Sequence, residues 1–255
     1  MDDRGHEGVP VLAKWITCDV PSGSRVAFAA AQRGWSVIAD EPGLVCQVGG
    51  WDSRTGRAHV LALWVDRAGH RAFLRDRHDS VASGGGCRDV EVVLGDVLFA
   101  MPGATPGVVP AGLTGGDVSL LTSGPGVVAA GAGVGDGVPS GSGGALGVAR
   151  AMGAGGVLRV ADCRLAEGAE EHFVDVQRRV WAPAMNAAGM LGGVFVRLGA
   201  GRYLVVTSWP DVEVHRRYSE RVPRLRELAG AVTDLTGSTG HVVPLEPTWR
   251  VVGNR

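Results

Sequence analysis

The sequence lacks the charge and hydropathy patterns that mark several common classes of protein. Lys14 is the only lysine among 25 basic residues, and the arginines are interspersed with 26 acidic residues, so the formal net charge is −1. This balance offers no basic surface to nucleic acid or to an anionic membrane. No apolar run approaches the roughly 20 residues that span a bilayer. We therefore expect neither a nucleic-acid partner nor a membrane partner.

Signals for export, disulfide formation, metal binding and serine catalysis are also missing. The first ten residues, MDDRGHEGVP, contain acids and no apolar stretch, which predicts a cytoplasmic location. The four cysteines stand 28, 41 and 76 residues apart without a C-x-x-C pair, so we expect reduced thiols. There is no G-x-S-x-G motif. His59, His70 and His78 form no i, i+4 pair, so we expect no metal.

An internal repeat organises the chain. The matched landmarks are Val11 and Val157, Trp35 and Trp181, Gly43 and Gly189, Trp64 and Trp209, His70 and His215, and Phe73 and Tyr218. The first two spacings are 24 and 8 residues in both copies, and the third is 21 in one copy and 20 in the other. The last two landmarks follow the second tryptophan by 6 and 9 residues in both copies. We interpret this agreement as a tandem duplication.

Hydrophobic periodicity predicts the order β-α-β-β-α-β in each copy. In the first copy, we expect a strand over 11–20, a helix over 25–35 that the Ser22 and Ser24 region can cap, a hairpin over 45–64, a helix from Asp66 and a strand over 89–99. In the second copy, the corresponding elements are expected over 157–165, 167–185, 192–209, from Pro210 and Asp211, and over 241–252. The predicted fold class is α+β: two ferredoxin-like βαββαβ modules with antiparallel sheets, forming a fused, pseudo-dimeric barrel.

Residues 101–156 separate the copies and contain 18 Gly, 5 Pro and no aromatic residue. Such a composition buries too little apolar area to form a core, so we predict a flexible linker between modules at 10–100 and 157–251. GPGVVA, at 124–129, loosely matches a dinucleotide-binding fingerprint. However, no amphipathic helix and no correctly spaced acid follow it, which argues against a nucleotide site.

Several segments of the first copy resemble a known group of proteins. They are KWITCDVP near the start, the GW at Gly34 and Trp35, PGLVCQVGGW from Pro42 to Trp51, the strand-ending Trp64, and FLRDRHD. On these residues, the chain resembles the dimeric α+β barrel superfamily and its antibiotic biosynthesis monooxygenase-like modules, and residues 10–99 resemble the small YdbC-like family. The second copy resembles the broader superfamily through its element order, Trp209 and the helix VEVHRRYSERVPRLRELA, but Pro223 stands where the first copy has His78.

This resemblance implies a pocket between the sheet and the helices of each module. It leaves the chemistry open, since members include cofactor-independent oxygenases, polyketide cyclases, haem-degrading enzymes, isomerases and regulatory ligand-binding domains. Haem-degrading relatives use an Asn on the first strand, and a Trp and then a His on the second helix. The Trp position holds Phe73 or Tyr218 here and the first strands contain no Asn, so we do not expect haem.

Candidate catalytic residues lie in the second helix of the first copy. His70, Phe73, Leu74 and His78 fall near one helical face that should meet the sheet. A histidine on that face can act as a general acid or base near neutral pH, and Asp79 can orient the ring of His78. We therefore predict His70, His78 and Asp79 as catalytic. The alternative is a set of half-buried histidines that bond to backbone groups.

Aromatic residues are the candidates for binding a flat ligand. Their faces can line an apolar pocket, while indole N–H groups donate hydrogen bonds, although ordinary core packing is the alternative for each. Trp35 and Trp181 are expected to be structural. The predicted substrate-binding residues are Trp15, Trp51, Trp64, Phe73, His215 and Tyr218.

Together these features predict a small-molecule enzyme of the monooxygenase or cyclase type. It would act on an aromatic or polyketide-like substrate by acid-base chemistry without metal or organic cofactor. We expect an intramolecular pseudo-dimer. This arrangement is compatible with further assembly into a homo-oligomer. The alternative is a non-catalytic ligand-binding or stress-related barrel. An open, His-lined cavity in the first copy would favour catalysis, and a cavity filled by Trp and Phe would exclude it.

Overall fold

The computed structural model describes residues 12–82, 87–103, 147–148 and 151–254. Its elements follow the predicted order in both halves of the chain. The first module contains β1 (Leu12–Asp19), α1 (Arg25–Gly34), β2 (Leu44–Trp51), β3 (Ala58–Trp64), α2 (Arg67–Asp76), α3 (His78–Ala82) and β4 (Arg88–Pro102). The second contains β5 (Val157–Leu165), α5 (Glu170–Val176), α6 (Ala182–Ala187), β6 (Gly192–Gly199), β7 (Arg202–Trp209), α7 (Val212–Ser219), α8 (Val222–Leu228) and β8 (Leu235–Pro244), and is followed by β9 (Val251–Val252).

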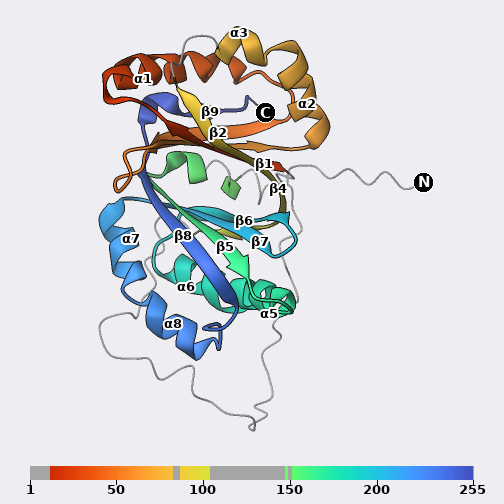
Figure 1. Cartoon of the computed structure of the whole chain (residues 1–255), viewed down its shortest axis with the longest axis vertical. Helices are drawn as coiled ribbons and strands as arrows, with labels where there is room; N and C mark the ends of the chain where they lie inside the picture. The colour runs from red at the N-terminus through yellow and green to blue at the C-terminus, as the bar shows by residue number, and fades with distance from the viewer. Residues whose placement is uncertain (1–11, 83–86, 104–146, 149–150, 255) are drawn as a thin grey trace, which may run out of the picture.

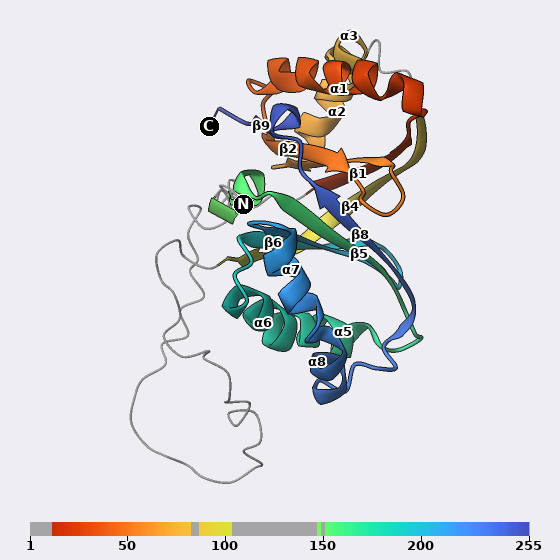
Figure 2. The same cartoon turned by 90° about the vertical axis from the view of Figure 1, so that its left-hand side faces the viewer.

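The strands form one antiparallel sheet in the order β8-β5-β7-β6-β4-β1-β3-β2-β9. The modules join where β4 pairs with β6, from Asp96 opposite Arg197 to Pro102 opposite Gly192. The sheet curls, and the helices of each module cover its outer surface at opposite ends of the molecule (Figures 1 and 2). This is the predicted pseudo-dimeric α+β barrel in one chain.

Alternation along the strands divides the side chains between two environments. Ala13 and Trp15 of β1 point to the inner face, where they share a core with residues of the second module such as Val160. Lys14 and Ile16 point the other way, toward the helices of their own module. Because successive side chains of a strand alternate between its faces, each module has a helix-facing layer separate from the common barrel core.

The end of the second module crosses to the first, which corrects the predicted strand over 241–252. β8 ends at Pro244, and Leu245 then forms an isolated bridge with Gly50 of β2. After a single 3-10 turn, β9 pairs with β2, with Val252 opposite Cys46. A proline lacks the N–H that a continuing strand would donate, so Pro244 and Pro247 divide the predicted strand.

Two glycines make this crossing possible. A Cβ atom on Gly50 would lie 1.9 Å from the carbonyl oxygen of Pro244, and one on Gly49 would lie 3.1 Å from the ring of Trp249. The backbone N–H of Glu246 donates to the Gly49 carbonyl at 2.9 Å. The GG pair of β2 therefore allows close backbone approach between the modules.

Other sequence landmarks have clear structural counterparts. Gly43 and Gly189 precede β2 and β6 with φ of 87° and 94°, a left-handed conformation that glycine adopts without strain. In the sheet register, Leu12 lies opposite Trp64 and Val157 lies opposite Trp209. Leu12, one position after the predicted Val11, is therefore the counterpart of Val157. The predicted helix over 167–185 is also interrupted, by a π-helical turn over 177–181.

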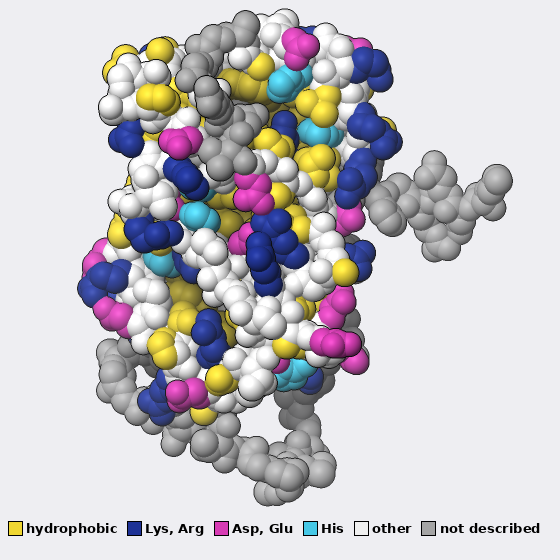
Figure 3. Space-filling view, viewed as in Figure 1, with side chains coloured by type: hydrophobic (Ala, Val, Ile, Leu, Met, Phe, Trp, Pro, Cys, Tyr) yellow, Lys and Arg dark blue, Asp and Glu magenta, His cyan; other side chains and the backbone are white. Residues whose placement is uncertain are grey.

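The predicted linker over 101–156 falls mainly outside the described residues, as does the GPGVVA segment. Of its described ends, Met101 and Pro102 belong to β4 and residues 151–154 are helical. On the face shown in Figure 3, basic and acidic side chains lie intermixed. Within the described ranges, no helix is long and apolar enough to cross a bilayer.

Candidate functional site

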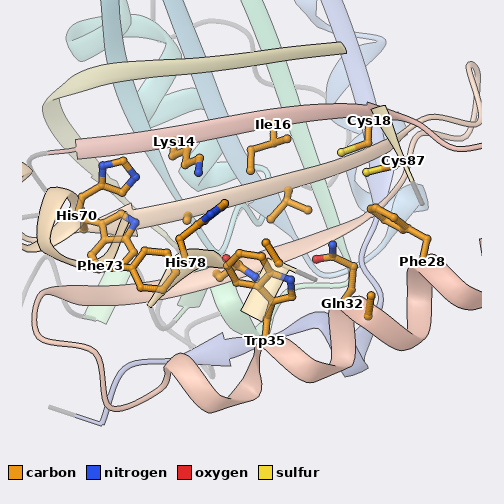
Figure 4. Close-up of a pocket in the computed structure, with 16 residues that line it drawn as sticks. Lys14, Ile16, Cys18, Phe28, Gln32, Trp35, His70, Phe73, His78 and Cys87 are labelled. Atoms are coloured by element: carbon orange, nitrogen blue, oxygen red, sulfur yellow. The ribbon is translucent and has the colours of Figure 1, made fainter. Parts of the chain in front are cut away.

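A cavity of about 450 Å³ lies in the first module between the outer face of the sheet and the helices (Figure 4). Lys14, Ile16 and Cys18 enter it from β1, and helix α1 and the turn that follows contribute Gln32 and Trp35. The lining also includes Phe28, Ala31, Gln47, Val60, Ala62, Trp64, His70, Phe73, His78, Ala82 and Cys87. This is the pocket that the superfamily resemblance implied.

One end of the cavity is built by a cluster of rings. The centroid of the Trp64 ring, at the end of β3, lies 5.3 Å from the ring centroids of both His70 and Phe73. Helix α2 is fixed at its start by the Asp66 side chain, which caps the helix by accepting from the Gly69 N–H. Positions 70 and 73 therefore turn inward, and both side chains are buried. The structure brings three of the predicted site residues, Trp64, His70 and Phe73, together at this end of the cavity.

His70 is neutral near pH 7 and has capacity to bond a ligand. Burial lowers its pKa to about 4, and the charges of Lys14, His78 and Arg67 act in the same direction. Its Nε2 atom has no hydrogen-bond partner among the described residues. The indole N–H of Trp64 is also unpaired within this part of the chain. Buried polar atoms without partners are uncommon in native proteins, so this pair suggests a ligand that bonds there.

His78 also lines the cavity, although not by continuing the helical face of His70. Helix α2 ends at Asp76, and His78 begins the separate helix α3. Its ring lies 5.9 Å from those of Trp35 and Phe73, and its Nδ1 is 3.1 Å from a carboxylate oxygen of Asp79. The Asp79 side chain is fully exposed and can only orient the ring.

Some predicted residues lie elsewhere. Leu74 is 38% exposed and does not share the buried face of α2. Trp15 was predicted to bind substrate but points into the barrel core. It follows Lys14 on β1, so its side chain lies on the opposite face of the sheet. Trp51 does not line the cavity either. Its ring packs against that of Trp249, with centroids 5.4 Å apart, and lies beneath the guanidinium of Arg25.

Trp35, Lys14 and Gln47 are among the lining residues that sequence reasoning missed or assigned otherwise. Trp35 was expected to be only structural, yet it lines the cavity. Lys14 and Gln47 place a cation and an amide on the floor of the cavity, on strands β1 and β2. The signal was present: Lys14 is the only lysine of the sequence, and it stands between the apolar residues Ala13 and Trp15.

The second module has a smaller cavity of about 210 Å³ at the matching place. His215 and Tyr218 line it, as does Trp181. Burial and the charge of Arg159 lower the pKa of His215 to about 4. The predicted residues of this module therefore share a pocket, but one separate from that of His70.

Comparison with known proteins supports the fold. A family described as "Domain of unknown function (DUF4937)" matches residues 12–90, a segment that contains every lining residue of the larger cavity. No curated protein matches the chain.

Solved structures match over nearly the whole chain. One described as a "Putative monooxygenase" from Fusobacterium nucleatum has a TM-score of 0.60 at 8% identity, covering 93% of both chains. A protein with the same description from Lactobacillus acidophilus has a TM-score of 0.59 at 7% identity, covering 95% of this chain and 96% of its own. An "anthrone oxidase-like protein" has a TM-score of 0.55 at 8% identity, covering 96% and 94%. The chain therefore has the fold of these ferredoxin-like, monooxygenase-related proteins.

Proposed function

We propose that the first module is a small-molecule oxygenase site that acts on an aromatic, polyketide-like substrate by acid-base chemistry without metal or organic cofactor. The observation that carries this proposal is the open cavity of about 450 Å³ with two buried groups that have no partner among the described residues, Nε2 of His70 and the indole N–H of Trp64. Two histidines and four Trp and Phe side chains line the cavity without filling it, which favours catalysis over a closed structural core. The similar fold of an anthrone oxidase-like protein supports this class of substrate.

The proposed reaction begins with proton transfer from the substrate. An anthrone or related phenol would bind with an oxygen at the Trp64 N–H, and Nε2 of His70 would remove the acidic proton. A pKa of about 4 makes the isolated imidazole a weak base. However, the imidazolium would form beside a substrate anion, and opposite charge favours the protonated ring. Lys14, on the same cavity floor, would stabilise that anion.

Oxygen then acts as the oxidant. For an anthrone, the ring CH₂ loses two hydrogens and gains one oxygen atom, and the other oxygen atom leaves as water. The electrons come from the substrate carbanion, so the protein itself is not oxidised. His78, oriented by Asp79, is the second candidate for the proton-transfer role.

In this proposal, both modules arose by duplication and the first kept the YdbC-like site. The second module completes the barrel and has a degenerate pocket. Its cavity has less than half the volume and lacks a counterpart of His78. It supplies the other half of the common core.

Oxygen uptake with a panel of anthrones and phenols tests the proposal, using the full chain in the presence of a chelator. We expect His70→Gln to lower kcat by about 10²–10⁴-fold, the usual contribution of a general base. His215→Gln is the matched control, since His215 has the same depressed pKa and contacts in the other module, and it should keep the wild-type rate.

Two results would contradict this assignment. Wild-type rates in both His70→Gln and His78→Gln would remove both histidines from the mechanism. Saturable binding of the same compounds without oxygen uptake would favour the non-catalytic ligand-binding alternative.

A further inference from the structure

A second group of ionisable residues lies at the junction of the modules, away from the cavity. Asp52 follows β2, His59 is in β3, and His241 comes from β8 of the second module. The crossing of the chain at Gly50 brings them together: His59 lies opposite Gly50 in the hairpin register, and the Ser53 N–H donates to the Val242 carbonyl at 3.2 Å. One potential ligand atom from each residue lies within 4.8 Å of the other two.

The Asp52 carboxylate is oriented by the hairpin turn. Its Oδ1 accepts from the N–H groups of Arg54 at 2.8 Å and Thr55 at 2.9 Å. This leaves Oδ2 to face both rings, at 2.8 Å from Nδ1 of His241 and 3.8 Å from Nε2 of His59. The Asp52 side chain is fully buried, so the turn holds an acceptor in place without solvent.

His59 is held so that one nitrogen points into the group. Its Nδ1 lies 3.2 Å from the hydroxyl oxygen of Thr17, and its ring stacks on Trp15 with centroids 4.9 Å apart. Nε2 is buried and has no hydrogen-bond partner in the described part of the chain. If Nδ1–H donates to Thr17, the lone pair of Nε2 is directed at Asp52 and His241. Such an outer hydrogen bond is how metal-ligating histidines are commonly oriented.

The surroundings of the two buried members, His59 and Asp52, act on their pKa values. Burial lowers the pKa of His59 to about 4, and the nearby His241 and Arg57 outweigh the opposing effect of Asp52. Burial alone would raise the pKa of Asp52, but bonds from Thr55, His241 and Arg54 lower it below its usual value. Neutral imidazole and ionised carboxylate are the ligand forms.

We propose that Asp52, His59 and His241 form a binding site for one divalent transition-metal ion, with zinc as the probe. Two imidazoles and one carboxylate suit zinc, iron or nickel better than magnesium or calcium, which prefer oxygen ligands alone. Three protein ligands leave further coordination positions open, and the 17% exposure of the His241 side chain provides a route in. His241 and Asp52 must separate by a few tenths of an ångström, because their 2.8 Å contact is shorter than ligand–ligand distances around zinc.

The site combines residues of both modules, so histidine spacing within one copy does not reveal it. His59 has no second histidine at metal-binding spacing in the first module, and His241 is 182 residues away in the sequence. An ion bound here would cross-link β3 to β8 and stabilise the junction of the modules. The site shares no residue with the larger cavity, so it is independent of the proposed oxygenase activity.

Equilibrium dialysis of zinc against the full chain tests the site. We expect one zinc per wild-type chain, and a loss of affinity in Asp52→Asn, His59→Gln and His241→Gln. Thr17→Val, which removes only the partner of a ligand, should weaken binding by roughly 10–100-fold. His172→Gln is the matched control: His172 Nδ1 contacts the Asp234 carboxylate at 2.9 Å, but no second histidine from the described part of the chain joins them. It should bind zinc as the wild type does.

Thermal unfolding provides a second readout that does not depend on activity. At a zinc concentration 100 times Kd, the wild-type Tm should rise by roughly 5–10 °C, and the His241→Gln Tm should not. Cobalt substitution checks the ligands, because a cobalt spectrum with thiolate bands would assign the ion to cysteine instead. Zinc binding that is absent, or unchanged in both His59→Gln and His241→Gln, would overturn the proposal and leave a hydrogen-bonded contact between Asp52 and His241.

Discussion

The two modules hold the same ring cluster in nearly the same geometry, yet differ in what surrounds it. The planes of Trp64 and His70 meet at 67°, and those of Trp209 and His215 meet at 70°. The neighbouring ring, Phe73 in one module and Tyr218 in the other, is tilted from the tryptophan by 31° and 28°. The cluster is thus a property of the scaffold and cannot by itself mark a site.

The two modules differ in the residues that line their cavities beside the tryptophan. In the second module, the Trp209 indole donates to the Thr207 hydroxyl at 2.9 Å. The corresponding residue before Trp64 is Ala62, which offers no acceptor. Within the described ranges, the first module therefore keeps an unpaired indole donor beside a larger cavity, whereas the second module pairs the corresponding donor with Thr207. Function is better sought in such departures than in the shared rings.

A second contrast lies in the hairpins. In the first module, Gly50 lies opposite His59, which stands five residues before Trp64. In the second module, the residue five before Trp209 is Leu204, and Val196 lies opposite it. Val196 is therefore the counterpart of Gly50. Only the first module has the second module's C-terminal segment crossing over its hairpin. The glycine pair is therefore a requirement of assembly, and a valine there should be incompatible with the crossing.

The largest predicted effect is that of Gly50→Val, which gives the first module the residue of the second. A Cβ atom would lie 1.9 Å from the Pro244 carbonyl oxygen, so the backbone must move and the junction must open. We expect the free energy of unfolding to fall by about 4 kcal/mol or more, at the upper end of overpacking effects. Urea denaturation measures this. Gly199→Ala, at a position with nothing within 4 Å, should change stability by less than about 1 kcal/mol.

The next effect concerns acid stability, where the modules should behave alike. His70 and His215 both have folded-state pKa values of about 4, below the ordinary value of 6.5. The unfolded chain thus binds protons first, so stability is full above pH 6.5 and is lost as pH falls toward 4. Each histidine should contribute about 3 kcal/mol to that loss.

Gln does not titrate in this range, so either variant tests the effect. Urea denaturation at pH 7 and pH 4.5 should show a smaller acid loss in His70→Gln and in His215→Gln than in the wild type, by similar amounts. A loss equal to that of the wild type in one variant alone would show that its module opens before the histidine is protonated, and would break the symmetry of the scaffold.

The sequence predicted the scaffold more completely than the site, for physical reasons. Matching Trp, Gly and His positions predicted the module order, because strand alternation and helix capping are local. Trp15 and Trp51 were misplaced because an aromatic residue in a strand does not reveal which face it occupies. Asp52, His59 and His241 could not be grouped, since only the crossing after Pro244 brings them together.

The smallest effect tests the contrast between Ala62 and Thr207 directly. Thr207→Ala leaves the buried Trp209 indole N–H without its acceptor, which should cost about 1–3 kcal/mol of unfolding free energy. Ala62→Thr offers Trp64 the bond that Trp209 has, so it should change stability by less than about 1 kcal/mol, in the favourable direction if the methyl fits. It should also raise KM for anthrones, because the hydroxyl would occupy the donor proposed for the substrate. Equal destabilisation by both substitutions would mean that packing at this position, rather than the unpaired indole, distinguishes the modules.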